Sequence, residues 1–148
     1  MDRIEGLAES FRASRVLLLT TYSEDGEHTR PMTNYGDDPY ATMWFPTDAG
    51  TQKVRDIRGN PNAAVSFPAT ERGAFYVVEG EAYMATSGEV RDRWVWWWLF
   101  WHPHLEETYY RPTGDEYYAE KAIVMFKPLR ARLVRGDEVE MLLKKARL

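Results

Sequence analysis

The feature that most constrains the fold is a series of six short segments rich in β-branched and aromatic residues, most of them joined by short turns. Such segments predict β-strands, and short connections favour antiparallel neighbours. The expected strands are RVLLLTTY (15–22), HTRPMTNY (28–35), YATMWF (40–45), NAAVSF (62–67), AFYVVEGEAYMA (74–85) and KAIVMFKPLRARLV (121–134). Helical patterns do not alternate with the strands, as a parallel sheet requires. The sequence therefore predicts an α+β fold built on an antiparallel sheet or small barrel with flanking helices.

Turn residues and prolines give this sheet further detail. Asp25-Gly26 predicts a tight hairpin, because glycine accepts positive φ. Pro31 cannot donate a ladder hydrogen bond, which predicts that its strand lies at an edge or contains a bulge. Gly80 predicts a kink in the fifth strand.

Helices are expected at both ends of the chain and at two places between strands. Residues 2–14 carry one apolar stripe, and Gly59-Asn60-Pro61 ends a short helix over 52–58. Ser87 is the expected N-cap of a helix over 89–101. The segment 102–120 is expected to be a loop, and the tail from 137 to 148 a terminal helix.

Composition narrows the function. The 148 residues predict one domain spanning 1–148, with 44% hydrophobic and 28% charged residues. The chain has no cysteine, which excludes thiolate catalysis and cysteine-based zinc sites. A net charge of -4 argues against general nucleic-acid binding. The amino terminus lacks a signal-peptide pattern and the longest apolar run is too short to span a bilayer, so a cytoplasmic location and no membrane partner are expected.

The stretch WFPTDAGTQKVRDIRGNP (44–61) places hydroxyls and a lysine where a strand gives way to a helix. The unpaired N–H groups of a helix start, the hydroxyls of Thr47 and Thr51 and the charge of Lys53 together suit a phosphate group. Gly50 would let backbone approach the ligand, and Arg30 on the neighbouring hairpin is the natural second cation. The competing interpretation is structural, with a threonine N-cap, a solvated lysine and an arginine in a surface ion pair.

Three motifs in this order, HTRPM, MWFPTD and TQKVRDIRGNPNAAVSF, resemble the flavin-binding part of the pyridoxamine 5'-phosphate oxidase-like split-barrel family, especially its general stress protein 26 branch. The resemblance covers roughly residues 5–85. It implies a six-stranded antiparallel split barrel and a homodimer with FMN at each subunit interface. The FMN-binding residues that it implies, at the phosphate, the ribityl chain and the ring, are Thr29, Arg30, Pro31, Met32, Trp44, Phe45, Thr47, Asp48, Thr51, Gln52 and Lys53.

The chain departs from the family pattern in two places. Many oxidases of the family have an arginine where this chain has Gln52, and their substrate-binding carboxy-terminal segment is reduced here to the dipeptide Arg147-Leu148. We therefore expect a flavin-dependent oxidoreductase acting on an unidentified small molecule other than the vitamin B6 substrate. Three alternatives stay open: a flavin-binding stress protein without turnover, a deazaflavin-binding barrel and a haem-binding barrel.

In the segment WVWWWLFWHPH (94–104), residues 94–101 would be apolar on every side of a helix. We expect it to pack between the barrel and a partner subunit, with Trp98 or Trp101 as a wall of the substrate or partner-subunit pocket. His102 and His104 are expected to be solvated, so no metal site is predicted. His28 is expected to be an exposed strand residue.

Overall fold

The fold was taken from a computed structural model, which describes residues 1–101 and 120–146, and for 95–101 only the backbone. In these residues the strands are β1 (Val16–Ser23), β2 (Gly26–Thr33), β3 (Met43–Asp48), β4 (Asn62–Pro68), β5 (Ala74–Met84) and β6 (Lys121–Arg135). The helices are α1 (Leu7–Ala13), α2 (Gln52–Gly59), α3 (Ser87–Trp101) and α5 (Asp137–Lys145). None of these helices is long and apolar enough to cross a membrane.

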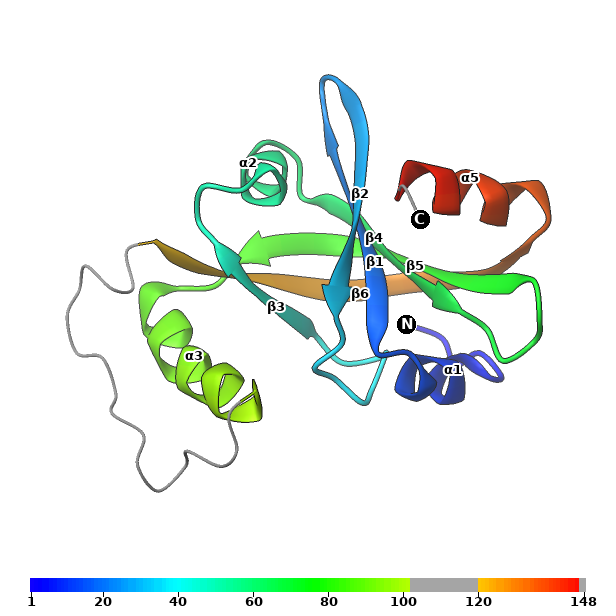
Figure 1. The fold of residues 1–148 in the computed structure, drawn as a ribbon, viewed down its shortest axis with the longest axis horizontal. Coiled ribbons are helices and arrows are strands. Elements are labelled where there is room, and N and C mark those ends of the chain that lie inside the picture. Colours follow the sequence, from blue (N-terminus) through cyan, green and yellow to red (C-terminus); the bar gives the residue numbers. More distant parts are fainter. Residues whose placement is uncertain (102–119, 147–148) are drawn as a thin grey trace.

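The six strands form one antiparallel sheet in the order β2-β1-β4-β5-β6-β3. The sheet curls so that β2 and β3, its two edges, flank the opening of a split barrel (Figure 1). Pro31 lies on β2 and Pro46 on β3. An edge strand pairs on one side only, so the missing N–H of proline removes the fewest hydrogen bonds there. The predicted α+β fold with a six-stranded antiparallel split barrel is confirmed, and so is the edge position of the strand that contains Pro31.

The long pair β5 and β6 bends at a β-bulge. Glu79 pairs with Arg130 and Gly80 with Pro128, so Leu129 is the extra residue on β6. A Cβ atom at Gly80 would lie 2.0 Å from the carbonyl oxygen of Lys127. Only glycine allows the two backbones to approach this closely, which confirms the predicted kink and gives its physical reason.

The main core fills the inside of the curled sheet, and α1 closes one end of it. Leu7 and Phe11 of α1 are fully buried there, and the ring of Phe11 meets that of Phe67 edge-on with centroids 5.4 Å apart. Two smaller clusters lie on the outside of the sheet, where α3 covers one end and α5 the other (Figure 1). Val90 and Trp94 anchor α3, and Val139 anchors α5.

Several boundaries differ from the prediction. The third strand runs from Met43 to Asp48 instead of 40–45, because Pro46 is tolerated at the sheet edge and the strand continues beyond it. The first helix is confined to Leu7–Ala13. The N-cap of α3 is Thr86 instead of Ser87. The hydroxyl of Thr86 accepts a hydrogen bond from the backbone N–H of Glu89, and the carboxylate of Glu89 accepts one from the backbone N–H of Thr86. The loop expected at 102–120 lies outside the described residues except for Glu120.

Candidate functional site

Helix α2 bridges the split of the barrel at one end. On one side, Lys53 in its first turn donates a 2.7 Å hydrogen bond to the hydroxyl of Thr47 on edge strand β3. On the other side, Asp56 accepts a 2.7 Å hydrogen bond from Thr21 on β1, beside edge strand β2. The start of α2 is therefore held between the two sheet edges, which is where the sequence predicted a phosphate site.

The turn before α2 is held by a backbone contact with the residue preceding β6 and by a side-chain hydrogen bond within the turn. The N–H of Ala49 donates to the carbonyl of Glu120, and the hydroxyl of Thr51 donates to the carbonyl of Asp48 at 2.9 Å. Thr51 occupies the N-cap position but makes no side-chain hydrogen bond to the first turn of α2. Thr51 is thus the N-cap residue that the structural interpretation expects, but its hydroxyl does not cap the first turn of α2. Asp48 points outward and lies 3.4 Å from Lys121.

Arg30 and Lys53 bring two positive charges to the place where the end of β3 meets the start of α2, which we call the corner. Burial of Lys53 lowers its pKa, and the nearby charge of Arg30 lowers it further, while Asp48 partly opposes the change. Burial also lowers the pKa of Arg30, with Asp56 opposing. Each cation is half-buried and Lys53 is destabilised by Arg30, so an anion between them would relieve both the desolvation and the repulsion.

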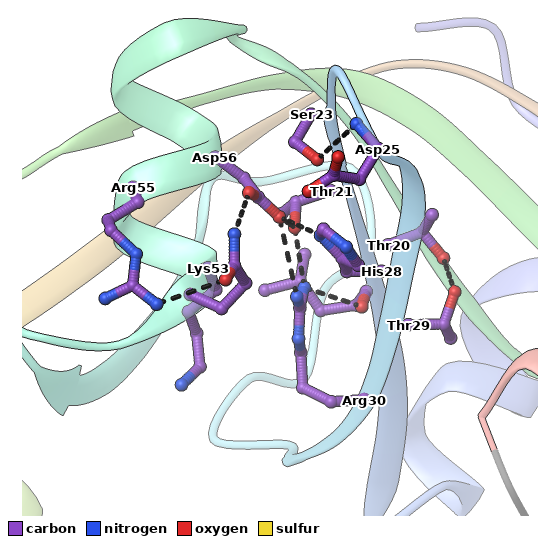
Figure 2. A network of polar contacts seen from close by, with 12 residues as sticks. Thr20, Thr21, Ser23, Asp25, His28, Thr29, Arg30, Lys53, Arg55 and Asp56 are labelled. Carbon is purple, nitrogen blue, oxygen red and sulfur yellow. Dashed lines mark hydrogen bonds and ion pairs between the residues drawn. The ribbon is translucent and has the colours of Figure 1, made fainter.

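Arg30 is fixed by β1, the strand beside its own. It pairs with Leu19 in the register of the hairpin, and its Nη1 donates to the Leu19 carbonyl at 3.2 Å and to the Thr21 hydroxyl at 2.8 Å. Its Nη2 lies 3.8 Å from Asp56. These contacts turn the guanidinium toward α2 (Figure 2).

Asp56 is the centre of the polar network in Figure 2, and its side chain is only 1% exposed. Its carboxylate lies 2.7 Å from the Thr21 hydroxyl, from Nδ1 of His28 and from Nε2 of Gln52. Burial alone would raise the pKa of Asp56, but these hydrogen bonds lower it below its usual value. Asp56 is therefore a buried carboxylate held in its ionised form.

This network uses the side chain of Gln52. Its amide nitrogen donates to Asp56, and its oxygen accepts a 3.1 Å hydrogen bond from Arg55. Lys53 extends away from the network in Figure 2, toward its contact with Thr47. The first turn of α2 thus separates its two polar side chains, with Gln52 bound to Asp56 and Lys53 directed to the corner.

The other residues expected around a ring do not all converge with Arg30. Thr29 bonds to Thr20 at 2.8 Å on the opposite face of β2, while Met32 packs against the core and Pro31 is exposed. Phe45 is 1% exposed inside the barrel. Its neighbour Trp44 faces outward, stacked on Tyr35 at 5.3 Å with Arg93 5.6 Å from its ring centroid.

Trp98, Trp101, His102 and His104 fall outside the residues whose side chains are described. Within the described part, no group of three or more acidic or histidine side chains is arranged to hold a metal ion.

The sequence interpretation missed Thr21, His28 and Asp56. His28 is not a freely exposed strand residue, because its ring bonds to Asp56 and its side chain is 31% exposed. One local signal was available, since Gln52 and Asp56 are four residues apart on a short helix and therefore share a face. The contacts of Asp56 with β1 and β2 span 35 and 28 residues and leave no local pattern.

The curled sheet with its bridging helix defines this protein as a split barrel. The chain belongs to the family described as pyridoxamine 5'-phosphate oxidase like, whose model matches residues 2–109. The predicted family is confirmed.

Solved structures share the fold at low sequence identity. A candidate pyridoxamine 5'-phosphate oxidase from Listeria innocua is 19% identical with a TM-score of 0.63, and the match covers 86% of this chain and 94% of that one. General Stress Protein 26 from Bacillus anthracis is 20% identical with a TM-score of 0.60, covering 89% and 97%. An F420 reductase is 19% identical with a TM-score of 0.62, covering 88% and 98%. The comparison with curated protein sequences finds no match.

Proposed function

We propose that this protein binds FMN, with the terminal phosphate at the corner formed by Arg30, Lys53 and Thr47. The observation that carries the proposal is the pair of half-buried cations, one of which lowers the pKa of the other. A phosphate monoester has a charge of about −2 near neutral pH and accepts several charge-assisted hydrogen bonds. Its charge and oxygen atoms match these two cations and the neighbouring hydroxyl.

Membership of the family supports a flavin as the group that carries this phosphate. When bound, a flavin supplies hydride-transfer chemistry. The residues of this chain would bind and orient the flavin. Arg30 and Lys53 would bind its phosphate, and the turn before α2 would limit the access of water to that phosphate. We therefore propose a flavin-dependent oxidoreductase that acts on a small molecule.

A deazaflavin is the second candidate cofactor, because one structure with this fold is an F420 reductase. Its phosphate would meet the same two cations. The proposal favours FMN because a terminal dianionic phosphate matches the charge of Arg30 and Lys53 directly.

We also propose that a second copy of the chain completes the site. The described residues supply the phosphate end, but Trp44 and Phe45 face opposite sides of β3 and cannot both contact one ring. A flat isoalloxazine ring needs apolar walls, and a homodimer in which each partner covers the other's corner would provide them.

The decisive experiment is a comparison of ligands on purified protein. Any coloured ligand is first released by denaturation and identified by mass. The ligand-free protein is then titrated with FMN, with riboflavin, which has the same ring without phosphate, and with FAD and F420. We expect FMN to bind about 10- to 100-fold more tightly than riboflavin. Equal affinity for FMN and riboflavin would rule out the phosphate corner, and tighter binding of F420 would make the deazaflavin the cofactor.

Turnover is tested separately on the FMN-bound protein. Reduction of the flavin absorbance by NADH or NADPH, followed by reoxidation when a substrate is added, is expected of an oxidoreductase. If NADH and NADPH do not reduce the bound flavin, and flavin reduced chemically is not reoxidised when a substrate is added, the protein would be a flavin-binding protein without turnover.

A further inference from the structure

The hydroxyl of Thr21 links Asp56 to Arg30. A threonine hydroxyl has one hydrogen to donate and accepts through its oxygen lone pairs. Thr21 donates that hydrogen to Asp56 at 2.7 Å, so its oxygen is left to accept from Nη1 of Arg30, which lies 2.8 Å away. By taking the hydrogen of Thr21, the carboxylate of Asp56 therefore leaves the Thr21 oxygen oriented to accept the hydrogen bond that Arg30 donates (Figure 2).

A second contact fixes the plane of the guanidinium. Nη1 of Arg30 also donates to the carbonyl of Leu19 at 3.2 Å. With Nη1 engaged by Leu19 and Thr21, the edge formed by Nε and Nη2 is the one left to bind a phosphate through two parallel hydrogen bonds. Such binding depends on the orientation of the fork more than on the presence of positive charge.

We propose that Asp56 is a positioning residue for the anion site and acts on Arg30 through Thr21. The proposal rests on the phosphate-binding function proposed above for Arg30 and Lys53. Asp56 is negatively charged and lies 3.8 Å from Nη2 of Arg30, so by charge alone it disfavours a bound phosphate. By orienting Arg30, Asp56 would instead strengthen phosphate binding. The two roles therefore predict opposite changes in FMN affinity when Asp56 is replaced.

The test uses near-isosteric variants and the FMN dissociation constant. Asp56→Asn keeps the size of the side chain, removes its charge and presents an amide donor in the network. If Asp56 only supplies charge, FMN affinity should rise in this variant. If Asp56 positions Arg30, the affinity should fall about tenfold, as for the loss of one hydrogen bond to a charged group. Glu71→Gln is the control, because it removes a carboxylate paired with Arg135 on the surface.

Thr21 provides the test of the link itself. Thr21→Val removes the hydroxyl at nearly constant volume and should weaken FMN binding by a similar factor, whereas Thr21→Ser should restore it. In an Arg30→Ala background, Asp56→Asn should no longer lower the affinity, because the loss is transmitted through Arg30 by one hydrogen-bonded chain. An undiminished effect of Asp56→Asn without Arg30 would overturn the proposal.

A ligand-free measurement keeps this proposal separate from the proposed function. Crystal structures of the ligand-free wild type, Asp56→Asn and Glu71→Gln should show the guanidinium of Arg30 displaced from Leu19 and Thr21 only in Asp56→Asn. If the wild type binds neither FMN nor inorganic phosphate, the proposed function fails while this comparison still reports on Asp56. An unchanged Arg30 in Asp56→Asn, or tighter FMN binding by it, would show that Asp56 does not position the arginine.

Discussion

The ammonium group of Lys53 donates a 2.7 Å hydrogen bond to the hydroxyl of Thr47, which attaches the first turn of α2 to the last residues of β3. The same helix is attached through Asp56 to β1 and β2. Helix α2 thus spans the two edges of an open sheet and carries one cation of the proposed site in the gap. The position of this site follows from how the barrel is closed.

Removing the charge of Lys53 should weaken FMN binding. Lys53→Ala is expected to cost about 1.5 to 3 kcal/mol, the typical contribution of one charge-assisted hydrogen bond. Isothermal titration or fluorescence quenching of FMN gives the dissociation constant. Lys127→Ala is the matched control, because Lys127 is an exposed lysine on β6. Unchanged affinity in Lys53→Ala, together with unchanged affinity in Arg30→Ala, would refute the corner as the phosphate site.

FMN binding should also weaken as pH rises into the range where Lys53 loses its proton. Burial and the charge of Arg30 lower the pKa of Lys53, so this loss should begin at a lower pH than for an ordinary lysine, whose pKa is about 10.4. A bound phosphate favours the charged lysine, and deprotonation therefore opposes binding. Lys53→Arg stays charged throughout and should flatten the profile measured between neutral and alkaline pH. The same slope in Lys53→Arg would assign the pH dependence to another group.

The strands, the family and the placement of Thr47, Thr51 and Lys53 where a strand gives way to a helix could be predicted because their signals are local. Runs of apolar and β-branched residues define most of β1, β4 and β6, and Gly80 marks the bulge through its lack of a side chain. The corner was visible because Thr47, Thr51 and Lys53 lie within seven residues of one another in the sequence.

The parts that could not be predicted depend on contacts between distant segments. The third strand was expected to end at Phe45, and only the place of Pro46 on the sheet edge shows that β3 continues to Asp48. The role of Asp56 depends on the curl that brings β1 and β2 against α2. A carboxylate between the buried residues Val54 and Ile57 would otherwise suggest a solvated helix position.

The buried carboxylate should make part of the stability dependent on acid pH. Hydrogen bonds lower the pKa of Asp56 in the folded protein, so its contribution is present above the unfolded value of about 3.9 and is lost as pH falls through the folded pKa. Asp56→Asn should unfold about 1 to 3 kcal/mol more easily at pH 7 and lose less stability between pH 6 and pH 3. Urea unfolding measures both values, with the exposed Asp137→Asn as control. An equal acid loss in wild type and Asp56→Asn would contradict the ionised, hydrogen-bonded state.

The bulge between β5 and β6 predicts a strict requirement for glycine. Gly80→Ala would place a methyl group 2.0 Å from the carbonyl oxygen of Lys127, so the strands must separate locally. We expect the free energy of unfolding to fall by about 1 to 3 kcal/mol. Gly88→Ala, in the first turn of α3 with no atom within 4 Å of the added methyl, should leave stability nearly unchanged. Equal denaturation curves for the two variants would show that the bulge can relax.

If a second copy of the chain completes the site, FMN binding and dimerisation must strengthen each other. A ligand held by both subunits binds the dimer better than the monomer, so FMN should lower the dimer dissociation constant measured by sedimentation. Lys53→Ala should reduce this coupling, because it weakens the grip of each subunit on the phosphate, whereas Lys127→Ala should leave it intact. A stable monomer at micromolar concentration that binds FMN with one-to-one stoichiometry would rule out the shared site and place the walls of the ring within a single chain.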